Sequence, residues 1–286
     1  MPATLGDTVA ARLAGLDERV RETVDLAAVI GDSVDLPTLL RAGSADRDTS
    51  MDAIDAAVAV GVLEPVAGTG DRYAFVHSIT RQVVLDRLPH TRCTALHARV
   101  AQTLEAHGDP ALAPRIAHHY LAAHVLGHHE RARHYAVAAA RQAAHSLAFE
   151  EAALWFDRAA TLPDTPEDVR AQLSFEAATN HVRAGDFARA REIYVRLTTM
   201  ADPLVRLRAA MGLEEAVGRP GLADCRAADL LAGALADSGS TRTTSGTSAG
   251  RAAWAGLSGS PAGRARAAGW AASRSTPPGA PATGPP

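Results

Sequence analysis

Apolar positions in the first third of the chain recur at the three- and four-residue spacing of amphipathic helices. This pattern predicts helices over residues 17–31, 35–41 and 50–61. Asp17 is the expected N-cap of the first helix, and Asp35, two residues before Pro37, fits the first turn of the second. Thr49 or Ser50 is the expected cap of the third helix.

Two short apolar runs follow, at residues 62–66 and 73–76, on either side of a Gly-rich turn at residues 68–71. Such runs around a turn are typical of a β-hairpin. Three helices closed by a hairpin are the layout of a winged helix, a compact variant of the helix-turn-helix. We therefore predict a winged-helix-like domain over residues 1–90.

The next segment, residues 91–236, is predicted to be one helix after another. The expected helices cover residues 92–107, 113–123, 130–146, 149–162, 167–184, 187–200 and 203–217. Only a few residues connect each helix to the next, so neighbouring helices are expected to lie antiparallel. The fold class is therefore mainly α.

A repeat is visible within this helical segment. Phe149-Glu150-Glu151-Ala152 followed by Trp155-Phe156 aligns with Phe187-Ala188-Arg189-Ala190 followed by Ile193-Tyr194, at an offset of 38 residues. A small residue that lets two helices touch, with an aromatic residue four positions later, is typical of tetratricopeptide-like helix pairs. We therefore interpret residues 91–236 as a tetratricopeptide-like helical array, although the strict 34-residue period is not met.

The composition changes abruptly at residue 237. Residues 237–286 are rich in Gly, Ser, Thr, Pro and Ala, and five Arg accompany the single acidic residue Asp237. Too few apolar residues occur in any period to offset the entropy of ordering, so this composition predicts a disordered tail. Two origins stay open: a flexible functional tail, or out-of-frame translation of a GC-rich gene.

The composition of the whole chain excludes several classes of chemistry. All 29 basic residues of the 286 are Arg. A phosphate-binding P-loop and Schiff-base catalysis both need Lys, so neither is expected. Cys93 and Cys225 are far apart and form no CxxC pair, which suits a reducing, cytoplasmic setting. No leader-like segment and no apolar run long enough to cross a membrane is found in the sequence.

Histidines are the strongest candidates for a metal site. Seven of the twelve lie between His107 and His134, and His124 and His128 have the i, i+4 spacing of one helix face. Gly127 is expected to break the helix between them, and no Asp, Glu or Cys completes a tetrahedral set nearby. We therefore predict no metal ligands and expect His119 and Tyr120 to pack inward.

The sequence also lacks the residues that are typical of catalysis and of DNA binding. No GxSxG motif is present, and the carboxylate pairs Glu150-Glu151 and Glu214-Glu215 are adjacent in sequence and diverge around a helix. The third helix carries Asp52 and Asp55 and no base on its face, although a DNA-reading helix must bring Arg or Lys to the duplex. The chain is therefore not expected to be an enzyme or to contact nucleic acid directly.

A series of motifs resembles a known family. These motifs are Leu26-Ala27-Ala28-Val29-Ile30-Gly31, Gly61-Val62-Leu63-Glu64, Tyr73-Ala74-Phe75-Val76-His77, Arg81-Gln82-Val83-Val84, Leu96-His97, Val100-Ala101-Gln102-Thr103-Leu104-Glu105 and Ala117-His118-His119-Tyr120. Over residues 10–235 the chain resembles the region behind the ATPase module of bacterial LuxR-type regulators, which are MalT-related signal-transduction ATPases of the STAND class.

The resemblance implies a domain order of P-loop ATPase, winged helix, helical repeats and a C-terminal LuxR helix-turn-helix. The chain would be a fragment without the first and last of these, with His77 near the interface to the ATPase. Its implied role is that of a regulatory, non-catalytic module whose helical array senses a protein partner or a small-molecule inducer. Two alternatives stay open: a DNA-binding winged-helix transcription factor, and a truncated, frame-shifted product without function.

Overall fold

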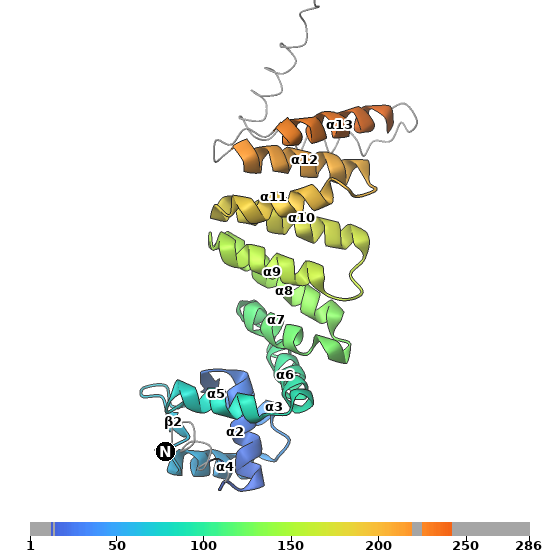
Figure 1. Ribbon diagram of the computed structural model, residues 1–286. Coiled ribbons are helices and arrows are strands. Elements are labelled where there is room, and N and C mark those ends of the chain that lie inside the picture. The colour runs from blue at the N-terminus through green and yellow to red at the C-terminus, as the bar shows by residue number, and fades with distance from the viewer. Residues whose placement is uncertain (1–12, 14, 219–224, 242–286) are drawn as a thin grey trace, which may run out of the picture. The chain divides into compact units, whose positions relative to one another are not determined.

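The computed structural model describes residues 13, 15–218 and 225–241, and the chain divides into two units after residue 231. Helices dominate the first unit, as predicted (Figure 1). Its N-terminal part consists of α2 (Glu18–Ile30), β1 (Ser33–Asp35), α3 (Leu36–Ala42), α4 (Arg47–Ala59), β2 (Leu63–Pro65), β3 (Arg72–Phe75) and α5 (Ser78–Arg87). The helices α2, α3 and α4 followed by the β2–β3 hairpin match the predicted winged-helix-like layout, and α5 is an additional helix that the pattern did not predict.

Carboxylate caps fix the start of the first three of these helices. The side chains of Asp17 and Asp35 accept hydrogen bonds from backbone N–H groups in the first turns of α2 and α3, as expected. The predicted cap of α4 was wrong. Asp46 accepts from the backbone N of Thr49 at 2.9 Å and from its hydroxyl at 2.8 Å, so the helix begins at Arg47, several residues earlier than predicted.

The three strands form an antiparallel sheet in the order β1-β3-β2. Leu63 of β2 pairs with Phe75 of β3, which confirms the hairpin, and Val34 of β1 pairs with Tyr73 on the other edge of β3. The sequence did not predict β1 because a three-residue strand is too short to show an alternating pattern. Val34 is fully buried and anchors this strand to the core.

The second part is a stack of antiparallel helices in which each helix packs chiefly on its neighbours in sequence (Figure 1). It comprises α6 (His90–Glu105), α7 (Ala113–Ala122), α8 (His129–His145), α9 (Phe149–Thr161), α10 (Glu167–Ala184), α11 (Phe187–Leu197) and α12 (Pro203–Gly218), with short 3₁₀ turns at Pro110–Leu112 and His124–Leu126. All seven predicted helices are present. A further helix that the pattern did not predict, α13 (Cys225–Thr241), follows them.

The 38-residue repeat has the packing role that its sequence suggested. Ala152 in α9 and Ala190 in α11 are fully buried, and the large side chains that follow them, Phe156 and Tyr194, are also in the buried class. Small residues at the helix contacts let the axes approach closely, and the aromatic rings fill the space beside them. The tetratricopeptide-like array is therefore confirmed.

The predicted domain limits at residues 90 and 237 do not coincide with breaks in the structure. The N-terminal core does not end at residue 90, because Leu96, Val100 and Leu104 of α6 pack into the same cluster as the winged helix. At the other end, α13 continues to Thr241, beyond the predicted start of the tail at residue 237. The remaining residues of that predicted tail, 242–286, lie outside the described residues.

A second apolar cluster fills the helical array from Ala117 to Ala227. Alanines supply much of it, and Trp155, Phe156 and Tyr194 supply the large side chains. The half-buried side chains of Leu121 and Tyr135 pack against both clusters. The beginning of α8, which carries Tyr135, therefore lies where the winged-helix core meets the array.

Candidate functional site

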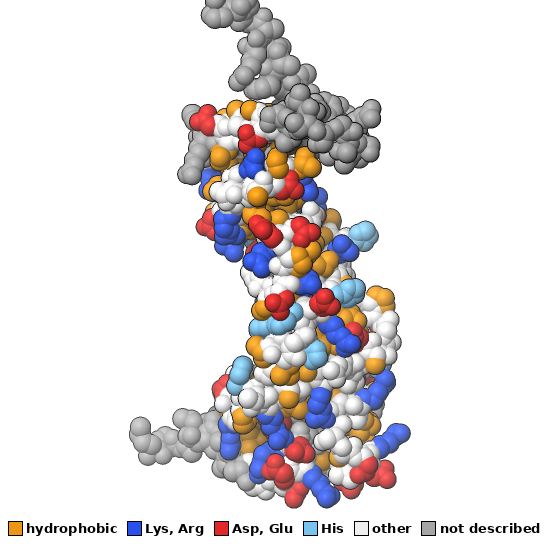
Figure 2. Space-filling model, turned by 90° about the vertical axis from the view of Figure 1, so that its right-hand side faces the viewer, with side chains coloured by type: hydrophobic (Ala, Val, Ile, Leu, Met, Phe, Trp, Pro, Cys, Tyr) orange, Lys and Arg blue, Asp and Glu red, His pale blue; other side chains and the backbone are white. Residues whose placement is uncertain are grey.

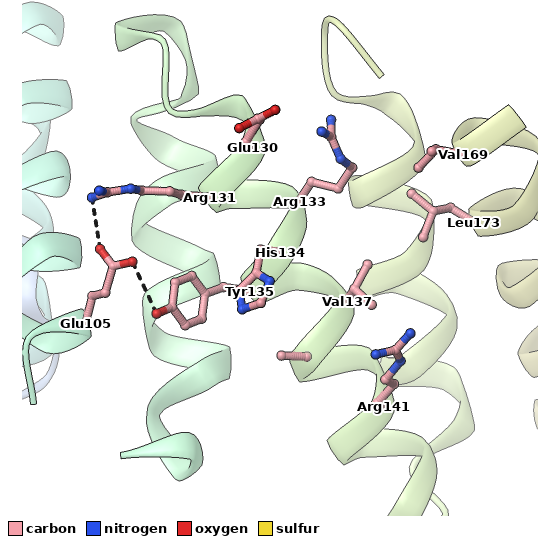
Figure 3. A pocket seen from close by; sticks show the side chains of 11 residues that line it. Glu105, Glu130, Arg131, Arg133, His134, Tyr135, Val137, Arg141, Val169 and Leu173 are labelled. Carbon is pink, nitrogen blue, oxygen red and sulfur yellow. Dashed lines mark hydrogen bonds and ion pairs between the residues drawn. The ribbon is translucent and has the colours of Figure 1, made fainter. Parts of the chain in front are cut away.

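A groove of about 690 Å³ runs along one face of α8 (Figure 3). Its lining residues come from the end of α6, from α8 and from the first turns of α10: Glu105, Glu130, Arg131, Arg133, His134, Tyr135, Val137, Ala138, Arg141, Val169 and Leu173. The α8 members fall mainly in two neighbouring rows with three- and four-residue steps, Glu130-His134-Val137-Arg141 and Arg131-Tyr135-Ala138, which together form a broad helix face. The groove is therefore formed by the way α8 packs between the end of α6 and the first turns of α10.

One wall of the groove is a closed polar network around Glu105 at the end of α6. The Glu105 carboxylate accepts hydrogen bonds from the Tyr120 hydroxyl, from Arg131 Nη1 at 3.0 Å and from the Tyr135 hydroxyl at 3.2 Å. Arg131 Nη1 also donates to the Tyr120 hydroxyl at 3.1 Å. The charge of Glu105 is thus satisfied within the protein, and this wall offers little unpaired charge to a ligand.

Both tyrosines of this wall remain protonated at neutral pH. Burial, reinforced by the hydrogen bond to Glu105, raises the pKa of Tyr120 to about 12. Burial and the nearby negative charge of Glu105 also raise the pKa of Tyr135. Each hydroxyl therefore acts as a hydrogen-bond donor to the carboxylate and not as a base.

The opposite end of the groove combines basic and apolar side chains. In Figure 3, Val137 lies between Arg133 and Arg141 along α8 and faces Leu173 of α10. Arg133 Nη1 donates to the Thr165 hydroxyl at 3.3 Å. Arg141 is exposed, and among the residues that the structure describes it has no hydrogen-bond or ion-pair partner. An unpaired guanidinium beside apolar side chains suits an anionic group attached to an apolar body.

The histidine pair that the sequence singled out does not form a site. His124 lies in a 3₁₀ turn and its Nδ1 contacts the carbonyl of Leu121 at 2.7 Å, whereas the His128 ring packs near the Tyr120 ring. Gly127 adopts a left-handed conformation (φ 84°) between them, which breaks the helix as predicted. His119 and Tyr120 pack inward, with exposed fractions of 2 % and 0 %, also as predicted.

The structure instead brings together three histidines, His97, His118 and His119. No sequence pattern indicates this cluster, because His97 lies on α6 and meets the other two only when α6 packs on α7. His77, for which the family resemblance implied an interface role, has an exposed side chain at the start of α5.

The outer face of α4 is acidic, as the sequence suggested. Asp48, Asp52 and Asp55 are all exposed, and Arg47 is the exposed base of that helix. On the face shown in Figure 2, acidic and basic side chains are interspersed over the N-terminal part, and pale-blue histidines gather over the middle of the array. No continuous basic surface is visible among the described residues on this face.

No helix among the described residues has the length and apolarity needed to cross a bilayer.

Comparisons with known proteins add one structural similarity. No family profile matches the chain, and no curated protein matches it. Among solved structures, the chain is similar to a STAND protein with a tetratricopeptide repeat sensor from Pyrococcus horikoshii, at 11% identity and a TM-score of 0.29. The match covers 76% of this chain and 37% of that one, so this chain spans well under half the length of that protein. A similarity at this level establishes neither a shared family nor a shared function.

Proposed function

We propose that the chain is a non-catalytic regulatory module whose helical array binds an anionic, partly apolar ligand in the groove along α8. The observation that carries this proposal is the guanidinium of Arg141, which has no polar partner within the described part of the chain and lies next to the apolar side chains of Val137 and Leu173. Stacked α-hairpins commonly present such surfaces to partners. The ligand is either a small inducer or a segment of a protein partner that carries a carboxylate or phosphate.

The polarity of the groove sets the orientation of the ligand. Glu130 and Arg141 lie at opposite ends of the α8 face, about 16 Å apart at the helical rise of 1.5 Å per residue. An anionic group would be attracted to Arg141, whereas beside Glu130 the positive charges of Arg131 and Arg133 are offset by the carboxylates of Glu105 and Glu130. An apolar body attached to it would cover Val137 and Leu173, because these side chains lie on the same face.

The finer part of the proposal is that this module belongs to a LuxR-type STAND transcriptional regulator. Its support is the series of motifs in residues 10–235 together with the order of winged helix followed by helical array. In that arrangement the acidic outer face of α4 would contact another protein domain and not DNA. A conformational change caused by ligand binding at the array would then reach the ATPase domain through the N-terminal core, which packs against the array.

The absence of enzymatic activity belongs to the same proposal. Glu105 and Tyr135 of the groove wall are already bonded, to each other and, through Glu105, to Tyr120. A general base needs a free acceptor within reach of a substrate proton. The groove accordingly offers binding groups and no activated nucleophile.

Octanoate is a minimal probe for this groove, since it joins one carboxylate to an apolar chain. We expect a titration of the full chain, followed by two-dimensional NMR, to perturb amide signals of α8 and α10. Octanol has the same chain without the charge and should bind more weakly. Arg141→Gln should weaken octanoate binding about 10-fold, the size expected for loss of one charge-assisted hydrogen bond of about 1.5 kcal/mol.

Arg47→Gln is the matched control, because Arg47 is an exposed arginine on α4, outside the groove. It should bind octanoate as the wild type does. The proposal is wrong if octanoate leaves the signals of α8 and α10 unchanged, or if Arg141→Gln and Arg47→Gln weaken binding equally.

A further inference from the structure

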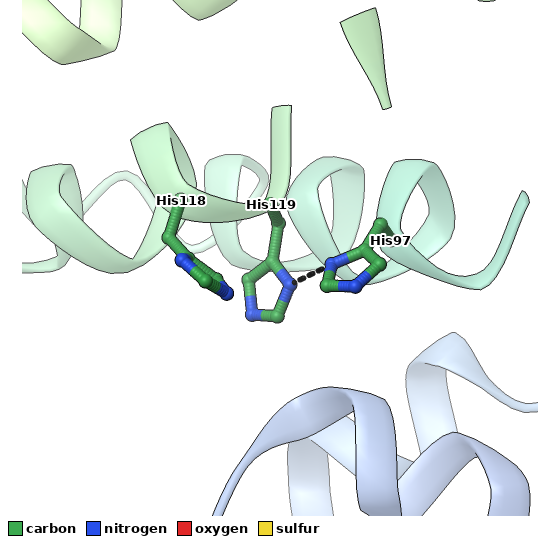
Figure 4. Close-up of side chains that lie close together, drawn as sticks. All are labelled: His97, His118 and His119. Atoms are coloured by element: carbon green, nitrogen blue, oxygen red, sulfur yellow. Dashed lines mark hydrogen bonds between the residues drawn. The ribbon is translucent and has the colours of Figure 1, made fainter. Parts of the chain in front are cut away.

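Three imidazoles converge between the first two helices of the array. His97 lies on α6, and the neighbouring residues His118 and His119 lie on α7. One ring nitrogen from each comes within 4.8 Å of the other two, and His97 Nδ1 lies 2.9 Å from His119 Nδ1 (Figure 4). The ring centroids are 5.1–5.8 Å apart. Three facing nitrogen ligands are the donor set of many zinc sites.

The nitrogen–nitrogen distance of the His97–His119 pair is close to that around a tetrahedral metal. With Zn–N distances of about 2.0–2.1 Å, two ligand nitrogens of a tetrahedral site lie about 3.3 Å apart. The His97–His119 pair would open by a few tenths of an ångström, and His118 would move inward by a rotamer adjustment. The backbones of α6 and α7 need not shift, because the three side chains already project toward one another (Figure 4).

We propose that His97, His118 and His119 form a binding site for a borderline divalent transition metal, with Zn²⁺ as the reference ion. The three imidazoles occupy three positions of a tetrahedral site. The fourth position stays open to water or to an anionic group. This site is separate from the groove along α8 and does not depend on the function proposed for it.

The protonation states of these residues favour metal binding at neutral pH. Burial lowers the pKa of His97 to about 4 and that of His119 to about 2, and partial burial also lowers the pKa of His118. A neutral imidazole keeps one proton, which it can carry on Nε2 while Nδ1 binds the metal. Metal binding would replace the His97–His119 hydrogen bond by two metal–nitrogen bonds. The ring that donates from Nδ1 would change tautomer and carry its proton on Nε2, so both imidazoles would stay neutral.

The surroundings of the site determine its selectivity. The positive charges of Arg81, Arg115 and Arg158 are near enough to contribute to the lowered histidine pKa values, and the described residues place no carboxylate in the cluster. The positive charges of these arginines weaken the attraction of the histidine cluster for a bare cation. They favour an anionic fourth ligand such as hydroxide or chloride, and they disfavour Mg²⁺ and Ca²⁺, which prefer oxygen ligands.

Calorimetric titration of the full chain, stripped of metal with a chelator, with ZnSO₄ tests this proposal. We expect one zinc per chain, and a Co²⁺ titration should give the visible absorption of tetrahedral nitrogen coordination. MgCl₂ should give no comparable binding. His118→Gln removes the most exposed of the three ligands with least disturbance to the core, and it should weaken zinc binding at least about 10-fold. His97→Gln should do the same.

The double variant His124→Gln/His128→Gln is the control, since it removes the histidine pair suggested by spacing alone and leaves the cluster intact. It should bind zinc as the wild type does. Two results would overturn the proposal: wild-type protein that takes up no stoichiometric zinc, or His118→Gln and His97→Gln variants that bind zinc like the wild type. Loss of binding in the control double variant would also contradict it, because the metal would then lie elsewhere.

Discussion

A single buried histidine is expected to make the stability of the N-terminal core depend on pH. His119 is 2 % exposed, and burial, together with the positive fields of Arg115 and Arg81 and the nearby His97 and His118, lowers its pKa to about 2 in the folded protein. In the unfolded chain its pKa returns to about 6.5. The unfolded state therefore binds more protons below pH 6.5, and stability is lost as the pH falls.

We expect the free energy of unfolding to drop by about 2 kcal/mol from this residue between pH 7 and pH 5. Urea unfolding at the two pH values, in the presence of a chelator, measures the drop. His119→Gln cannot titrate, so its stability should change less with pH than that of the wild type. Equal pH dependence in the two proteins would show that folding does not lower the pKa of His119.

Glu105 organises the polar wall of the groove, and its loss should be measurable. Glu105→Gln replaces a carboxylate that accepts from Arg131, Tyr120 and Tyr135 by a neutral group with one fewer acceptor oxygen. We expect a loss of about 1–2 kcal/mol in the free energy of unfolding at pH 7. Glu130→Gln is the matched control, because Glu130 is exposed on the same groove and should change stability by less than about 0.5 kcal/mol. A similar loss in both variants would contradict the network.

At the level of the elements, close helix contacts depend on small residues. Gly212 in α12 lies directly against the ring of Tyr194 from α11, and a Cβ atom at this position would overlap the ring carbons. Tyr194 is buried and cannot swing aside. This contact extends the small-residue and aromatic pairing of the repeat by one more helix.

Gly212→Ala should therefore destabilise the protein by about 1–3 kcal/mol, because overpacking outweighs the gain in helix propensity. Gly233→Ala provides the comparison, since Gly233 lies in α13 with open space around its Cα. There the substitution should be neutral or stabilise by up to about 1 kcal/mol. Thermal unfolding of both variants checks the pair, and equal effects would show that Gly212 is not in close contact.

The elements differ in how far their sequence predicts them. The seven helices of the array were predictable because long apolar periods and Gly or Pro breaks mark their limits. Strand β1 and the cap at Asp46 were not, because each depends on one contact: pairing with β3, and a carboxylate that reaches Thr49. Helix α5 likewise lacks a clear apolar face, with Thr80 and Val84 as its buried residues.

At the level of the whole molecule, the N-terminal core and the array share residues. Leu121 and Tyr135 pack against both apolar clusters, and Arg81 of α5 donates to the carbonyl of Ala28 at the end of α2 at 2.8 Å. Helix α6 also belongs to both parts, because Leu96, Val100 and Leu104 pack in the winged-helix cluster while the helix packs on α7 of the array. A ligand that restricts the motion of α8 would therefore affect side chains that pack in the N-terminal core and side chains that pack in the array.

Neither site could be located from the sequence, for the same physical reason. The groove depends on the distance between α8 and α10, and the histidine cluster depends on how α6 packs on α7, so both are products of tertiary packing. The sequence did indicate that the array is a surface for binding and that the histidines around α7 are unusual. It could not show that His97 completes the group, or that Arg141 is left unpaired.

Hydrogen–deuterium exchange of the full chain, with and without a saturating octanoate probe, tests the proposed binding surface most directly. We expect slower exchange in peptides that cover residues 129–145 and 167–184, which form the two helices of the groove. Peptides from α4 should exchange at the same rate in both samples. Unchanged exchange in α8 and α10, or protection confined to other helices, would contradict the assignment of this face as the recognition surface.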